Sequence, residues 1–127
     1  MTPASSSRWI LAASGLLLAI ATLLGALAAH ALPGRLSASD LYVFDTAVRY
    51  HFYNALGLLG IGLAARNVDS RLVRWAGGLV IAGIVLFCGS LYWLTFGAPW
   101  VVGFVTPVGG VAFTVAWLLF AFGVLRG

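Results

Sequence analysis

Long apolar stretches separated by short polar breaks dominate this chain. Charge-free apolar runs extend over Trp9 to Ala29, Trp75 to Phe96 and Val108 to Leu125. Each has roughly the length that a helix needs to cross the hydrocarbon core of a bilayer. The pattern therefore predicts three transmembrane helices directly.

A fourth apolar stretch, from Phe52 to Ala65, is too short by itself, because a helix of this length would measure about 21 Å. It reaches a spanning length only if the helix begins near Ser39 or Asp40. Ser39 would cap the helix N-terminus, and Asp40 would suit its positive end. We therefore expect a fourth helix whose first turns, with Asp45 and Arg49, lie at headgroup depth.

Turn-forming residues separate the predicted spans, for example Leu32-Pro33-Gly34 and Gly97-Ala98-Pro99, and Thr106-Pro107 opens the last one. The predicted fold class is all-α: a polytopic membrane protein built as a compact antiparallel bundle of four transmembrane helices. We expect one domain over residues 1–127, with spans at residues 9–31, 41–65, 75–96 and 107–125.

Composition and charge support a membrane location. Of the 127 residues, 62% are hydrophobic and only 8% are charged, whereas about a quarter of the residues of a soluble domain are charged. Five of the seven arginines fall on one side of the predicted membrane: Arg8, Arg66, Arg71, Arg74 and Arg126. The positive-inside rule then predicts that both termini are cytoplasmic. This asymmetry explains the net charge of +4 without a nucleic-acid partner.

The single cysteine and the N-terminal segment each narrow the possibilities for this chain. Cys88 is the only cysteine, so an intramolecular disulfide and a cysteine metal cluster are excluded. Arg8, the apolar run after it and Ala26-Leu27-Ala28 resemble a signal peptide, but the run is longer than a usual signal core. We therefore expect the first span to be retained.

Small residues mark places where helices could approach closely in lipid. Gly25 and Ala29 are four residues apart in the first span, Gly89 lies in the third, and Gly109 and Gly110 open the fourth. We predict these five residues as helix-packing positions. The same spacing links Gly15 with Ala19 and Gly78 with Ala82.

Polar residues from all four spans are predicted to meet at the outer end of the bundle. The members are His30, Asp45, Arg49, His51, Asn54, Ser90, Tyr92 and Thr106. Polar groups at membrane depth face the protein interior or water and are candidate functional residues. The plainer interpretation is structural, with Asp45 and Arg49 forming an ion pair and the others forming hydrogen bonds between helices.

Four motifs give the chain a family resemblance: GALAAH at residues 25–30, TAVRY at 46–50, LFCGSLY at 86–92 and FVTPVGGVAF at 104–113. The chain resembles the YgdD-type family of small four-span bacterial inner-membrane proteins, which has a eukaryotic relative. The resemblance implies a location in the bacterial inner membrane and a family of unassigned molecular function. Family members tend to read Tyr-Gln-x-x-His where this chain has Tyr50-His51-Phe52-Tyr53-Asn54. Asn is a poor ligand for transition metals, so no metal site is expected here.

Three functions compete. The first is an accessory or scaffolding protein in the lipid bilayer that binds a membrane-protein partner, a further copy of itself or a lipid. The second is a bundle or carrier that binds a small solute or lipid in the outer polar cluster. The third is a redox protein with a b-type haem between His30 and His51. We favour the first, with no cofactor. We expect no enzyme, because HExxH, paired carboxylates and a usable Ser-His-Asp order are missing from the sequence.

Overall fold

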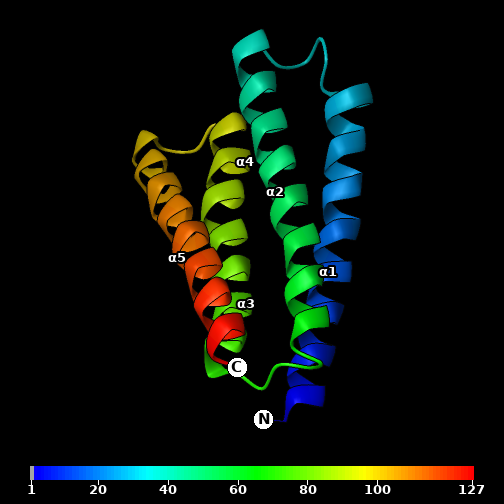
Figure 1. Cartoon of the computed structure of the whole chain (residues 1–127). Coiled ribbons are helices and arrows are strands. Elements are labelled where there is room, and N and C mark those ends of the chain that lie inside the picture. The colour runs from blue at the N-terminus through cyan, green and yellow to red at the C-terminus, as the bar shows by residue number, and fades with distance from the viewer. Residues whose placement is uncertain (1) are drawn as a thin grey trace.

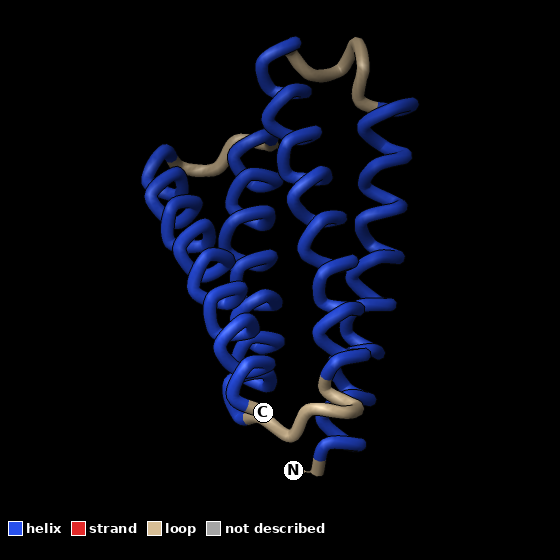
Figure 2. The backbone as a smooth tube through the Cα atoms, in the orientation of Figure 1, coloured by secondary structure: helices blue, strands red, loops and turns tan. Residues whose placement is uncertain are grey.

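The structure is a computed structural model that describes residues 2–127, and it is helical throughout that range apart from turns and short loops. Within this range the helices form four long segments. The segments lie side by side, and both chain ends lie at the same end of the molecule (Figure 1). Short loops join the segments (Figure 2). In chain order the segments are α1 (Pro3–Ala26) with the π-helical turn η1 (Leu27–Ala31); α2 (Ala38–Ala64); α3 (Arg71–Gly83), the π-helical turn η2 (Ile84–Cys88) and α4 (Gly89–Thr95); and the 3₁₀ turn η3 (Trp100–Phe104) with α5 (Val105–Arg126).

Three of the segments are long and apolar enough to cross a membrane: Ser5–Ala31, Arg71–Thr95 and Trp100–Arg126. The remaining segment, α2, is 27 residues long but is not among them. Its first half contains Asp45 and Arg49, together with further polar residues that lower its mean hydropathy. The segment that was the least apolar in the sequence is thus a long helix, but its composition is not apolar enough to mark it as a membrane span.

The helices begin earlier than the apolar runs predicted. The N-terminal cap of α2 is Ser37, whose hydroxyl oxygen accepts a hydrogen bond from the Asp40 N–H at 3.1 Å. The prediction of Ser39 as the cap is therefore wrong by two residues. At α3, Ser70 caps a helix that already starts at Arg71. Arginines in a first turn can extend their charged ends toward water while their stems pack on apolar surface. The charged residues before the apolar run therefore belong to the helix, and the start of the run is not the start of the helix.

The interior is mainly apolar and is built by pairs of segments. α1 packs mainly on α2, α3 packs mainly on α5, and α2 also contacts α3 and α4. Ile10 of α1, Leu58 and Ile61 of α2, and Val80 of α3 belong to one fully buried cluster between them. Because α1 has a single major neighbour, much of its surface faces away from the protein.

The predicted close-packing positions divide into three groups. A Cβ at Gly109 would collide with the backbone of Phe87, so α5 and η2 touch directly there. Gly110 and Gly25 would meet only ordinary contacts. The prediction fails at Gly89, where nothing lies within 4 Å of a Cβ, and at Ala29, which is exposed. Four-residue spacing recurs on every face of a helix, so spacing alone did not identify the face that is packed.

Candidate functional site

The polar residues of α2 lie on two different faces of the helix. Asp45 and Arg49 form an ion pair of 3.3 Å between Oδ2 and Nε, and their side chains are 54% and 48% exposed. His51 and Asn54, by contrast, are 3% and 6% exposed. Residues four apart share a helix face, so the ion pair lies outside while the imidazole and the amide lie inside.

His51 joins α2 to α4. Its Nδ1 lies 2.9 Å from the hydroxyl oxygen of Tyr92, and the tautomer decides which atom donates. The Tyr92 ring also packs on Phe44 with 5.1 Å between ring centroids. The other ring nitrogen, Nε2 of His51, is buried without a hydrogen-bond partner. The imidazole is therefore held in the interior by one bond, with one nitrogen unused.

Asn54 joins α2 to α5. The indole N–H of Trp117 donates to Oδ1 of Asn54 at 3.1 Å, and Nδ2 of Asn54 donates to the carbonyl oxygen of Tyr50 at 3.0 Å. A Cβ at Gly57, one turn further along α2, would overlap the Trp117 ring. The glycine thus leaves room for the indole to lie against α2 and reach the amide.

Ser90 and Thr106 join α4 to α5 by a short contact between their hydroxyl oxygens. The Ser90 hydroxyl donates to the carbonyl oxygen of Phe87 at 2.9 Å. Because a serine hydroxyl has a single proton, Thr106 is the donor in the bond to Ser90. Both hydroxyls are consequently used within the protein.

The remaining member of the predicted cluster, His30, is exposed at the end of η1. Among the described residues it has no hydrogen bond or ion pair with the other seven. His51 lies 13 residues into α2, which is about 20 Å from the helix start. The predicted cluster is therefore not one site at one end. It divides into an exposed ion pair, a separate His30 and three part-buried bonds between helices.

Two contacts escaped the sequence prediction. Trp117 was not expected to be the partner of Asn54. Ser7 in α1 donates to the carbonyl oxygen of Gly62 in α2 at 2.8 Å, and this bond is buried. Asn54 stands out as a polar residue within an apolar run, whereas Ser7 lies in the polar stretch before the first run and gave no such signal. In both cases the hydrogen-bond partner is more than fifty residues away in sequence and is not encoded in local spacing.

Two hollows of the surface are lined by residues that take no part in the bonds of His51, Asn54 and Ser90. A shallow depression of about 350 Å³ includes Tyr42 and Asp45 near the α1–α2 loop. A larger groove of about 500 Å³ lies at the opposite end of the molecule, between Trp9 of α1 and Arg74 of α3. Within residues 2–127, no three His, Cys, Asp or Glu side chains gather in an arrangement that could hold a metal ion. Among the buried polar residues, Ser7, His51, Asn54 and Ser90 connect helices.

Comparison with known proteins gives a consistent family. Residues 24–110 match the model of the family described as protein of unknown function, DUF423. A UPF0382 membrane protein of Staphylococcus saprophyticus is 42% identical over 117 residues, which cover 92% of this chain and 95% of the relative. The UPF0382 membrane protein YwdK of Bacillus subtilis is 44% identical over 111 residues, covering 87% of this chain and 89% of YwdK.

A UPF0382 membrane protein of Haemophilus influenzae is 38% identical over 100 residues, covering 79% of this chain and 80% of the relative. No solved structure matches the chain. The family match covers more than half of the chain. The three relatives each match at least 79% of it and are named as membrane proteins. The chain therefore belongs to the DUF423 family, whose UPF0382 members are membrane proteins of unknown function.

Proposed function

We propose that this protein crosses the bacterial inner membrane four times as an antiparallel helix bundle, with both termini cytoplasmic, and that it is a non-catalytic accessory protein docking another transmembrane helix. The YgdD-type resemblance and its eukaryotic relative stay predictions from the sequence motifs. The proposal has two parts, topology and docking, and each is tested separately.

The length and environment of α2 support a fourth span. Its 27 residues correspond to about 40 Å of helix, more than the roughly 30 Å of a bilayer core. His51 and Asn54 are bonded inside the protein, so α2 need not expose them to lipid. Asp45 and Arg49 are paired near the outer end, where charge is less costly than at the bilayer centre.

The positions of the chain ends support the orientation. Both ends and the α2–α3 loop lie at one end of the molecule (Figure 1), together with five of the seven arginines. Fluorescent-protein fusions to either terminus should fluoresce, since the reporter folds in the cytoplasm. An alkaline phosphatase inserted at Gly34 or Gly97 should be active. Active phosphatase at a terminus would refute the orientation.

The observation that carries the docking function is the exposed face of α1. The apolar part of Ser5–Ala31 is buried to only 17%, the lowest share of the three apolar segments, compared with 22% in Trp100–Arg126 and 33% in Arg71–Thr95. One edge of this face consists of small exposed residues at helical spacing: Ala12, Gly15, Ala19, Thr22 and Ala26. Nothing lies within 4 Å of a Cβ at Gly15. A smooth, unfilled helix surface in lipid suits close approach by another helix.

Site-specific photo-crosslinking in the native membrane tests this docking. A photoreactive residue at Ala19 should give a discrete product with another membrane-spanning chain. The same residue at Leu118, an exposed position on α5, is the matched control and should give none. Gly15→Leu with Ala19→Leu should abolish the product while the protein still inserts. Differently tagged copies of this chain distinguish self-association from a different partner, and equal products from Ala19 and Leu118 would refute the docking face.

A further inference from the structure

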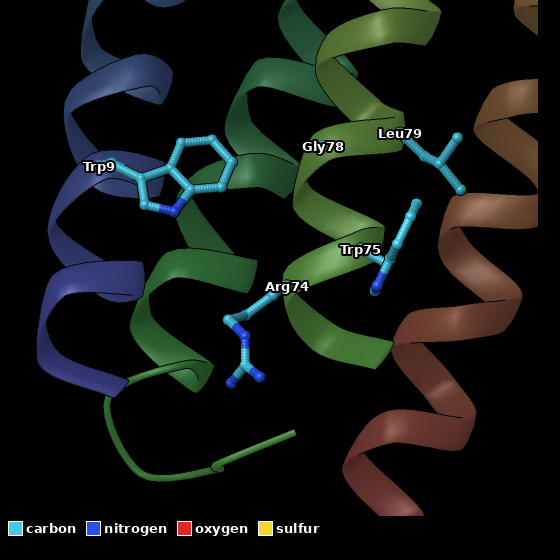
Figure 3. Close-up of a pocket in the computed structure, with 5 residues that line it drawn as sticks. All are labelled: Trp9, Arg74, Trp75, Gly78 and Leu79. Atoms are coloured by element: carbon cyan, nitrogen blue, oxygen red, sulfur yellow. The ribbon is translucent and has the colours of Figure 1, made fainter. Parts of the chain in front are cut away.

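A groove of about 500 Å³ crosses α3 close to the end of the molecule that holds both termini. Figure 3 shows Gly78 at its floor, the Trp9 indole on the α1 side, and Trp75 and Leu79 on the α5 side. Arg74 lies at the end of the groove nearest the α2–α3 loop (Figure 3). The groove is thus apolar along most of its length and charged at one end.

The apolar part is open to the surroundings of the protein. Nothing lies within 4 Å of a Cβ at Gly78, and Trp75 is 62% exposed. Tryptophan concentrates at the boundary between lipid headgroups and hydrocarbon. Trp9 and Trp75, on different segments, lie beside the same groove, which is consistent with an interface at this height. An acyl chain is the apolar group that such a groove would meet in a membrane.

The charged end can accept a phosphate. The Arg74 side chain is 26% exposed and bonds Oδ1 of Asp69 at 3.0 Å through Nη1. A guanidinium has five N–H donors, so donors remain for a phosphate oxygen beside this pair. Arg8, Arg66, Arg71 and Arg126 belong to the same end of the chain topology. Arginine matches the fork geometry of phosphate groups, and basic pockets at the cytoplasmic ends of transmembrane helices bind anionic lipid headgroups.

Trp9 supplies a second, independent indication of a ligand. Its indole nitrogen is buried and has no hydrogen-bond partner. In Figure 3 the nitrogen-bearing edge of the ring is on the side facing the Arg74 guanidinium. A buried N–H without a partner is costly, and a rotation of the Trp9 ring toward the groove would let it donate to a lipid ester or phosphate oxygen seated between Trp9 and Arg74.

We infer that this groove binds one anionic phospholipid of the cytoplasmic leaflet, with its phosphate at Arg74 and one acyl chain over Gly78. The inference is independent of the docking face on α1, because the groove is lined by Trp9 and residues of α3 and none of the small residues of the docking face line it. Asp69 limits the affinity, since it competes with the phosphate for the same guanidinium.

Native mass spectrometry of the full-length protein tests the site, using mixed micelles with equal amounts of phosphatidylglycerol and phosphatidylcholine. The wild type should retain one phosphatidylglycerol in preference to phosphatidylcholine. Arg74→Gln should lower that preference about fivefold, the effect of one basic residue near an anionic surface. Gly78→Leu should displace the lipid, because a leucine would occupy the floor of the groove. Asp69→Asn should raise phosphatidylglycerol retention.

Two matched controls separate a site from general attraction. Arg66→Gln removes an exposed arginine at the same end that does not line the groove. Gly60→Leu fills open space beside an exposed glycine on α2. Both should retain lipid as the wild type does. The inference is overturned if the wild type shows no preference, if Arg66→Gln and Arg74→Gln act equally, or if Gly78→Leu retains its lipid. Should Arg74→Gln fail to fold, unchanged retention by Asp69→Asn would be enough to overturn it.

Discussion

The indole N–H of Trp117 in α5 donates a 3.1 Å hydrogen bond to the side-chain oxygen of Asn54 in α2. The two residues are 63 positions apart, and this bond fixes both the spacing and the rotation of their helices. Apolar packing in lipid tolerates sliding more readily than a single directed bond does, because lipid tails compete with apolar side chains but offer no hydrogen-bond partner. Asn54 therefore contributes to the register of the fold.

Trp117→Phe tests this bond while keeping an aromatic ring against Gly57. The substitution leaves Oδ1 of Asn54 without its partner, and we expect a loss of about 0.6 kcal/mol, with an upper limit near 1.7 kcal/mol. Detergent unfolding followed by tryptophan fluorescence or circular dichroism would measure it. Asn54→Ala should lower the stability less in the Trp117→Phe background than in the wild type, because the bond is already absent there. If the losses from the two changes add fully, the bond contributes nothing.

Gly109→Ala should be far more damaging than Gly110→Ala. A Cβ at Gly109 meets the backbone of Phe87, which cannot move aside as a side chain could, whereas the nearest atom to a Cβ at Gly110 is 3.9 Å away. Overpacking of this kind costs about 1–3 kcal/mol. Each variant adds one methyl group, and the two positions are neighbours in the sequence. Their unfolding midpoints can therefore be compared directly. Equal midpoints would contradict direct contact of α5 with η2.

Asp45→Asn combined with Arg49→Gln should leave membrane insertion and the unfolding midpoint nearly unchanged. The pair is half exposed, and such helix pairs are worth only about 0.3–0.5 kcal/mol. Expression level, membrane fractionation and the detergent midpoint check this expectation. Loss of expression would indicate that the pair is shielded in the membrane, by lipid or by a partner.

The sequence predicted well the features that depend on neighbouring residues, and less well those that depend on contacts between distant segments. Apolar run length predicted three of the long helical segments, and the turn residues predicted the breaks between them. Charge misled the boundaries, since Arg71 and Arg74 begin a helix that the apolar count started at Trp75. The predicted outer cluster divided because helix rotation puts Asp45 outside and His51 inside. The partners of Asn54 and Ser7 depend on which helices are neighbours, and that information is not contained in any single segment.

Tyr92→Phe isolates the bond between α4 and α2. The aromatic ring that packs on Phe44 stays in place, while Nδ1 of His51 loses the hydroxyl that lies 2.9 Å away. Both ring nitrogens of a buried imidazole would then lack partners, because Nε2 already has none. We expect a loss of about 1 kcal/mol, within the range measured for such bonds in membranes, read as a lower detergent-unfolding midpoint.

The control for this loss is Tyr42→Phe, which removes the hydroxyl of an exposed tyrosine on α2 and should leave the midpoint unchanged. A double-mutant cycle with His51→Phe then separates the bond from the burial of the ring. If the bond matters, Tyr92→Phe should cost less in the His51→Phe background than in the wild type, because its partner is already absent. An equal cost in both backgrounds would instead mean that the Tyr92 hydroxyl acts through another group, and that His51 is held by packing alone.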